Sequence, residues 1–194
     1  MRSGACQRST TETDVAVSIG LDGSGQREIA TGLRMLDHLL EQLAFHSRAD
    51  LRISARSLDG IAHHLVEDVA LTLGQAIADA LGERRGIERY GSVLLPMDDA
   101  LARVALDFSG RPFARVELEF GVERIEGLDC VLIPHFFRSL ASKCGLTLHV
   151  DLLCAADPHH AVEACFKALG RALAIAWSVT ASDLELIPST KGTI

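Results

Sequence analysis

The sequence lacks the features that mark membrane, secreted and nucleic-acid-binding proteins. No apolar run approaches the length of a membrane span. The N-terminal residues have no basic flank followed by an apolar core, as a secretory signal would require. The formal net charge is -7, whereas binding to a phosphate backbone normally requires a basic surplus. These absences predict a cytoplasmic protein with neither a membrane nor a nucleic acid as its partner.

The sequence also lacks a cysteine pairing pattern. The five cysteines are odd in number and form no C-x-x-C pair, which argues against a disulfide framework and a zinc ribbon. What is present is the composition of an ordinary globular protein, with 48% hydrophobic and 23% charged residues. A chain of 194 residues can bury one good core or two small fused ones.

One pentapeptide occurs twice, as HHLVE at residues 63–67 and as HHAVE at residues 159–163. The patterns around the two copies follow one order. In each half, alternating apolar and polar residues interrupted by a turn predict a β-hairpin, and a helix, a strand and a long helix follow. The charged, glycine-flanked stretch 81–91 separates the halves. The predicted elements are hairpins at 14–33 and 101–120, helices at 34–46 and 134–143, strands at 51–58 and 146–153, and long helices at 63–81 and 159–177.

The two halves also correspond residue by residue. His38 matches His135 and Glu67 matches Glu163, in one register with a single-residue slip. Chance similarity would not keep such a register, so we interpret residues 1–86 and 87–194 as two copies of one ββαβα unit. Each unit supplies a sheet face and the helices that cover it. The expected fold is α+β, a single compact unit with two four-stranded sheets and four helices packed between them.

The repeated motif is suited to metal binding. In a helix, His63 and Glu67 share one face, while His64 lies about 100 degrees around the axis. Neutral imidazoles with a carboxylate suit Mn, Fe or Zn. A lone histidine is usually an ordinary surface or core residue, but six of the eight histidines occupy equivalent positions in the two repeats. We expect two metal centres, each with an open position, from His38, His63, His64, Glu67, His135, His159, His160 and Glu163.

The two halves differ at the start of the long helices. Asp157 followed by Pro158 predicts a good N-cap for the second helix. The first helix has Ile61 and Ala62 at these positions, so we expect Asp59 or a partner contact to start it, and we expect an outer carboxylate for one metal-bound imidazole to be missing.

Longer blocks around these residues resemble the imidazoleglycerol-phosphate dehydratase family of histidine biosynthesis. The blocks cover almost the whole chain and include LDHLLEQLAFH, HHLVEDVALTLGQA, RYG, PMDDAL, DFSGRPF, HFFRSLASKCGLTLH, HHAVEACFKALGRAL and the terminal PSTKG. The resemblance implies a manganese enzyme that removes water from D-erythro-imidazole glycerol phosphate to give imidazole acetol phosphate. It also implies a homo-oligomer in which trimers form a 24-subunit shell with active sites between subunits.

The resemblance further implies roles for individual residues. Two Mn²⁺ ions per active site are expected, with Fe and Zn also compatible with the ligands. His63 and Glu67 would join His160 around one ion, His159 and Glu163 would join His64 around the other, and His38 and His135 would complete the two sets. Glu12 is expected to shuttle a proton, with Glu67, Glu163 and His46 as the other catalytic residues.

The substrate-binding residues follow from the same blocks. Gln42 and His46 share a helix face with His38, and His46 has no histidine counterpart in the second half, which favours contact with the substrate diol or proton transfer. The phosphate-binding positions are Arg89, Arg111, Lys167, Ser189 and Lys191. The chain departs from the family pattern at Ile61, Ala62, Asp99 and Pro134.

Two other interpretations of the motif stay open. A metal hydrolase would use a similar donor set, but neither an H-E-x-x-H motif nor a nucleophile elbow is present. A structural shell protein could use the histidines only to hold subunits together through metal ions. Such a protein would have no use for the set of phosphate-binding residues, which therefore favours the dehydratase.

Overall fold

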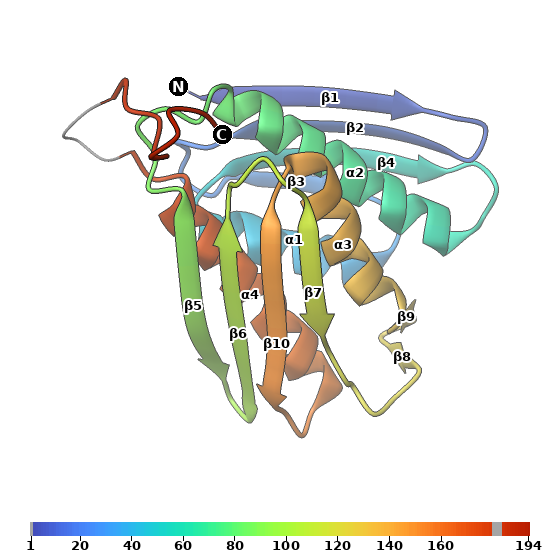
Figure 1. The fold of residues 1–194 in the computed structure, drawn as a ribbon. Coiled ribbons are helices and arrows are strands. Elements are labelled where there is room, and N and C mark those ends of the chain that lie inside the picture. Colours follow the sequence, from blue (N-terminus) through green and yellow to red (C-terminus); the bar gives the residue numbers. More distant parts are fainter. Residues whose placement is uncertain (1, 180–183) are drawn as a thin grey trace.

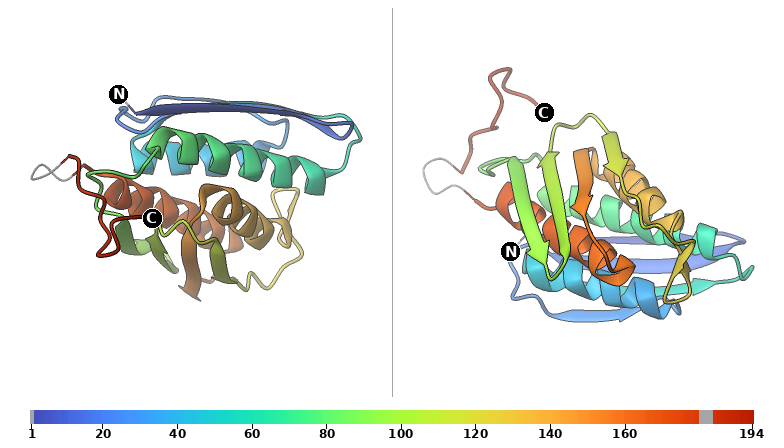
Figure 2. Two further views of the ribbon diagram at one scale, coloured as in Figure 1. Left: turned by 45° about the horizontal axis from the view of Figure 1, so that its top comes forward. Right: turned by 90° about the horizontal axis from the view of Figure 1, so that it is seen from below.

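The computed structural model describes residues 2–179 and 184–194 of the chain. The elements form four layers, in which two sheets enclose two pairs of helices (Figures 1 and 2). The expected fold class is therefore confirmed. The first half contains β1 (Ser3–Ser9), β2 (Thr13–Gly20), β3 (Arg27–Ala30), α1 (Arg34–Ser47), β4 (Asp50–Ser57) and α2 (Ala62–Leu81). The second half contains β5 (Tyr90–Met97), β6 (Ala100–Asp107), β7 (Phe113–Glu117), β8 (Arg124–Ile125), β9 (Leu128–Asp129), α3 (Leu132–Cys144), β10 (Thr147–Cys154) and α4 (Pro158–Ala176).

The two large sheets share one strand order, β1-β2-β4-β3 in the first half and β5-β6-β10-β7 in the second. The predicted hairpins are wrong, because β4 lies between β2 and β3, and β10 lies between β6 and β7. Each half also has a first strand, β1 or β5, that the predicted ββαβα unit lacks. Placing β4 at the centre of its sheet gives it two hydrogen-bonded neighbours and buries Leu51 and Ile53 against the helices.

The helices pair across the two halves. α1 packs against α4, and α2 packs against α3. Both contacts depend on a helical glycine that lets the backbones approach closely. A Cβ at Gly170 of α4 would lie 2.7 Å from the Leu43 carbonyl oxygen of α1, and a Cβ at Gly74 of α2 would lie 2.7 Å from the Leu140 carbonyl oxygen of α3. The four helix axes are therefore fixed by two equivalent contacts.

The core fills the space between the helices and the sheets. Val15, Val17 and Ile19 alternate on the inward face of β2 and are each at most 3% exposed. α3 and α4 also contact each other through Phe136 and Phe166, whose ring centroids are 5.2 Å apart. None of the helices in residues 2–179 and 184–194 combines the length and hydropathy needed to span a bilayer.

Candidate active site

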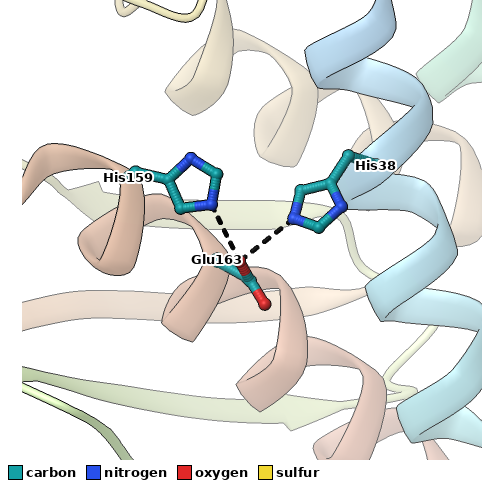
Figure 3. A group of neighbouring side chains, drawn as sticks. All are labelled: His38, His159 and Glu163. Carbon is teal, nitrogen blue, oxygen red and sulfur yellow. Dashed lines mark hydrogen bonds and ion pairs between the residues drawn. The ribbon is translucent and has the colours of Figure 1, made fainter.

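The first group of candidate ligands joins α1 to α4. His159 and Glu163 lie one turn apart at the start of α4, and His38 reaches the same carboxylate from α1. Its Nε2 atom lies 3.0 Å from Glu163 Oε2, and His159 Nε2 lies 3.1 Å from the same oxygen. Figure 3 shows both rings directed at this one carboxylate. The group thus takes one histidine from the first half and the His-x-x-x-Glu pair from the second.

Glu163 is held in its ionised form. The residue is only 7% exposed, and Lys167 Nζ donates a hydrogen bond to its other oxygen, Oε1, at 2.7 Å. Burial raises the pKa of the Glu163 carboxyl, but the hydrogen bonds from Lys167 and His38 outweigh it and bring the pKa to about 2. A carboxylate must be deprotonated to serve as a metal ligand, so Glu163 is in the correct state near neutral pH.

The second group is the counterpart of the first and joins α2 to α3. His63 and His135 stack with ring centroids 4.4 Å apart. Their Nε2 atoms lie 4.0 and 3.7 Å from Glu67 Oε2. His135 Nε2 is buried and has no hydrogen-bond partner among residues 2–179 and 184–194. A buried nitrogen without a partner is costly, and a metal ion would satisfy it. The residues present therefore fit a metal.

The second histidine of each HHxxE motif faces away from its own group. The His63 and His64 rings are inclined at 86°, and the His159 and His160 rings at 84°. His64 Nδ1 lies 2.6 Å from Asp59 Oδ2 and 3.6 Å from Glu12 Oε2. The hydrogen bond to Asp59 raises the pKa of His64. The helical spacing thus separates the two histidines of a motif as expected.

His160 has an equivalent arrangement at the other motif. Its Nδ1 atom lies 2.6 Å from Asp99 Oδ1, and its Nε2 atom lies 3.6 Å from Asp98 Oδ2. The hydrogen bond to Asp99 raises the pKa of His160. The same hydrogen bond, together with those from the Asp157 and Ala156 backbone N–H groups, lowers the pKa of Asp99.

The two motif helices begin in different ways. The Asp157 side chain accepts a hydrogen bond from the His159 backbone N–H and Pro158 follows it, so the predicted cap of α4 is confirmed. Ile61 offers α2 no side-chain cap, and Asp59 Oδ1 accepts from the Ile61 N–H at 2.9 Å instead. The expectation that an outer carboxylate is missing in the first half is wrong, because Asp59 also contacts His64.

A row of predicted substrate-binding side chains follows the first group along α1 and α4. Gln42 and His46 lie one and two turns beyond His38 on α1 and are both half-buried. A Cβ at Gly170 of α4 would lie 3.2 Å from His46 Cβ. Burial lowers the pKa of His46, and the positive charge of Lys167 lowers it further. The imidazole is thus favoured in its neutral form, in which it can accept a proton.

Four of the five predicted phosphate-binding residues line one cavity. Arg89, Arg111, Ser189 and Lys191 all contribute to its wall, and its volume is about 400 Å³. Arg89 is fixed by Asp107, whose Oδ1 lies 2.6 Å from Arg89 Nε. Its Nη1 atom donates to the Pro188 carbonyl at 2.8 Å and so ties the C-terminal segment to the cavity.

The cavity and the histidine groups lie at opposite ends of the long helices. The Arg89 backbone N–H donates to the carbonyl of Ala176, the last residue of α4, whereas His159 lies at its start. At 1.5 Å per residue these two ends are roughly 25 Å apart. Figure 1 shows the C-terminal segment beside the end of α4 that is remote from its N-terminus. Lys167 belongs with the first histidine group, not with the cavity.

Sequence reasoning gave no role in the site to two carboxylates that contact the site histidines. The sequence indicated only that Asp59 could start the first long helix and that Asp99 departs from the family pattern. A signal existed for Asp59, which precedes its imidazole partner by five residues. Asp99 reaches His160 from a turn that is remote in sequence, so no local pattern could have indicated the contact.

Comparison with known proteins gives one consistent result. Residues 31–173 match the family model described as imidazoleglycerol-phosphate dehydratase. The imidazoleglycerol-phosphate dehydratase of Xanthobacter autotrophicus (strain ATCC BAA-1158 / Py2) is 49% identical over 100% of this chain and 99% of its own length. That of Roseobacter denitrificans (strain ATCC 33942 / OCh 114) is 48% identical over the full length of both chains.

Solved structures agree with the sequence comparisons. The imidazoleglycerol-phosphate dehydratase of Staphylococcus aureus subsp. aureus N315 superposes with a TM-score of 0.82 at 35% identity, covering 91% of this chain and 99% of its own. The Pyrococcus furiosus enzyme, solved in complex with (S)-C348, gives a TM-score of 0.84 at 37% identity, covering 97% and 99%. The chain therefore belongs to the imidazoleglycerol-phosphate dehydratase family of hydro-lyases.

Proposed function

We propose that this protein converts D-erythro-imidazole glycerol phosphate into imidazole acetol phosphate, with two Mn²⁺ ions in each active site. The observation that carries the proposal is the pair of matching groups, His38 with His159 and Glu163, and His63 with His135 and Glu67. Each group offers two imidazoles and one carboxylate, which leaves coordination positions for a further histidine and for the substrate.

The donor set limits the kind of metal. Imidazole and carboxylate ligands suit Mn, Fe and Zn alike, so Mn²⁺ is proposed from the family. When bound, the ions would act as Lewis acids on the imidazole ring of the substrate. This matters because the hydrogen that is lost sits on a carbon without a neighbouring carbonyl group, and a base alone would face a very weak acid.

The phosphate of the substrate would bind in the cavity at the C-terminal segment. Arg111 and Lys191 supply positive charge there, and the Ser189 hydroxyl supplies a further donor. Fork-shaped guanidinium groups suit the oxygens of a phosphate monoester. Because Arg89 already bonds to Asp107 and to the Pro188 carbonyl, it would shape the cavity and use its remaining N–H groups for the phosphate.

The reacting part of the substrate would lie beside the histidine groups. Glu12 is half exposed and lies 3.6 Å from His64 Nδ1, a position from which it would carry the proton. The hydroxyl next to the ring leaves, the neighbouring carbon loses its hydrogen, and the enol that results becomes the ketone. Gln42 and His46 would contact the two hydroxyl groups of the substrate.

The geometry favours an active site built from several subunits. One small substrate cannot reach both the phosphate cavity and the histidine groups of one chain, because a helix length of roughly 25 Å separates them. His64 and His160 face away from the two groups of their own chain and are available to neighbouring ones. We propose that they complete the ligand sets of adjacent subunits, within trimers that assemble into a 24-mer.

Turnover with and without metal tests the proposal. Chelator-treated protein is supplied with imidazole glycerol phosphate, and keto product is measured before and after Mn²⁺ is added. We expect product only with metal, and we expect His135→Ala to lose most of the activity because it removes a ligand. A wild-type protein that binds two Mn²⁺ ions per chain but forms no product would instead indicate the structural shell protein.

A further inference from the structure

The second histidine of each HHxxE motif is held by a carboxylate through the same ring nitrogen. Asp59 Oδ2 lies 2.6 Å from His64 Nδ1, and Asp99 Oδ1 lies 2.6 Å from His160 Nδ1. Both histidine side chains are half-buried, with 28% and 30% of their surface exposed. The two contacts are therefore equivalent in length and in ring atom.

These equivalent contacts come from residues that are not equivalent in the repeat. Asp59 precedes α2 in the loop after β4, whereas Asp99 lies in the turn between β5 and β6. In the second half two different residues make these contacts: Asp157 caps α4, and Asp99 holds the His160 imidazole. In the first half Ile61 stands at the position of the capping aspartate and α2 has no side-chain cap, while Asp59 accepts from the Ile61 N–H and holds the imidazole. Two aspartates at unrelated positions thus make the same contact with an imidazole, which indicates that the imidazole requires a carboxylate at Nδ1.

The hydrogen bonds define which nitrogen carries the proton. Asp59 also accepts from the Ile61 backbone N–H, and Asp99 also accepts from the Asp157 backbone N–H at 2.8 Å. Such carboxylates are ionised and can only accept, so the proton of each imidazole must lie on Nδ1. The lone pair of the neutral ring is then on Nε2, the nitrogen that does not bond to Asp59 or Asp99. At His160 this nitrogen lies 3.6 Å from Asp98 Oδ2, which is beyond hydrogen-bond distance.

We propose that Asp59 and Asp99 are positioning residues that fix His64 and His160 in the Nδ1–H tautomer, so that each presents Nε2 to a metal ion held by a neighbouring subunit. The inference rests on the proposed function, because it assigns the two histidines as ligands. Outer carboxylates of this kind orient metal-binding imidazoles and raise their basicity. In the first half Asp59 makes this contact although Ile61 stands at the repeat position of Asp157 and leaves α2 without a side-chain cap.

The test compares Asp59→Asn and Asp99→Asn with the control Asp157→Asn. The control removes a carboxylate that caps a motif helix but contacts no imidazole. Binding of Mn²⁺ is measured from the electron paramagnetic resonance signal of free Mn²⁺. The tautomers are read from ¹⁵N spectra of histidine-labelled, metal-free protein at an alkaline pH above the titration that the same spectra record for the two rings. We expect the first two variants to weaken one class of Mn²⁺ sites by about 10- to 100-fold, and the control to change affinity by less than about 3-fold.

Two further variants separate positioning from folding. Asp99→Glu keeps a carboxylate and should retain most of the affinity. Adding Ile61→Asp to Asp59→Asn restores a helix cap equivalent to Asp157 and should recover thermal stability but not Mn²⁺ affinity. The inference is overturned if wild-type His64 and His160 carry their protons on Nε2, or if both Asn variants bind Mn²⁺ as the control does. If wild-type protein binds no Mn²⁺, the proposed function fails, and the ¹⁵N spectra still decide the tautomer.

Discussion

The close contact between α1 and α4 gives a prediction with a definite sign. Replacing Gly170 by alanine would normally stabilise a helix by about 1 kcal/mol, because glycine is a poor helix former. Here the added Cβ would lie 2.7 Å from the Leu43 carbonyl oxygen and 3.1 Å from the Ser47 backbone nitrogen. Both are backbone atoms that cannot rotate away, so α1 must shift outward. Overpacking usually costs about 1 to 3 kcal/mol of stability, and a clash with backbone atoms belongs at the upper end of that range, about 3 kcal/mol.

The net expectation is a loss of about 2 kcal/mol in the free energy of unfolding. Urea denaturation of the metal-free variant, followed by circular dichroism, measures this loss. Arg171→Ala is the matched control, because it changes the next residue of α4 at an exposed position and should alter stability by less than about 0.5 kcal/mol. A gain in stability for Gly170→Ala would refute the packing argument.

The same variant also tests how packing supports the site. His38 Nε2 and Glu163 Oε2 lie 3.0 Å apart, and a shift of α1 would separate them. One class of Mn²⁺ sites should therefore bind the ion more weakly. Gly74→Ala should have the matching effect on the group of His63, His135 and Glu67, because its Cβ would meet the Leu140 carbonyl oxygen of α3. Equal weakening of both site classes by one variant would contradict this assignment.

Three further predictions follow from individual side chains. Glu163→Gln leaves Lys167 unpaired in a largely buried position and should lower the free energy of unfolding of the metal-free protein by about 3 kcal/mol, as measured by urea denaturation. Glu67→Gln changes a more exposed carboxylate and should lower it by less than about 1 kcal/mol. Arg111→Ala removes a charged donor from the cavity that we propose binds the substrate phosphate. It should raise KM about 10- to 100-fold in steady-state kinetics, with unfolding unchanged because the residue is exposed. Burial raises the pKa of the Cys144 thiol to about 12, so this thiol stays protonated between about pH 7 and 9 and should not react with a disulfide reagent. The exposed Cys154 should react. Mass spectrometry of the labelled protein identifies the modified thiol.

Local patterns were sufficient to find most of the elements. The apolar periodicity predicted helices at 34–46 and 63–81, and the structure has α1 at Arg34–Ser47 and α2 at Ala62–Leu81. Alternation identified β2, β4, β6 and β10 in the same way. The strand β1 was missed because its small and polar residues, SGACQRS, show no apolar alternation, as is common at a sheet edge.

Strand pairing could not be read from the chain. The sequence pattern favours a hairpin because β2 and β3 are consecutive and separated by a glycine-rich turn. In the fold, β4 lies between them and pairs with both. Insertion of a later strand depends on burying its apolar face against the packed helices, and no short-range pattern encodes that preference.

The sequence by itself determined which residues are the candidate ligands, because a duplicated unit repeats its histidines and glutamates in register and repetition is visible without coordinates. Only the tertiary structure decided how they are grouped. The pairing of α1 with α4 and of α2 with α3 brings His38 to Glu163 and His135 to Glu67, so each group combines both halves of the chain. The reason is physical: helical spacing fixes where a side chain points on its own helix, but which helix it meets depends on the packing of the whole core.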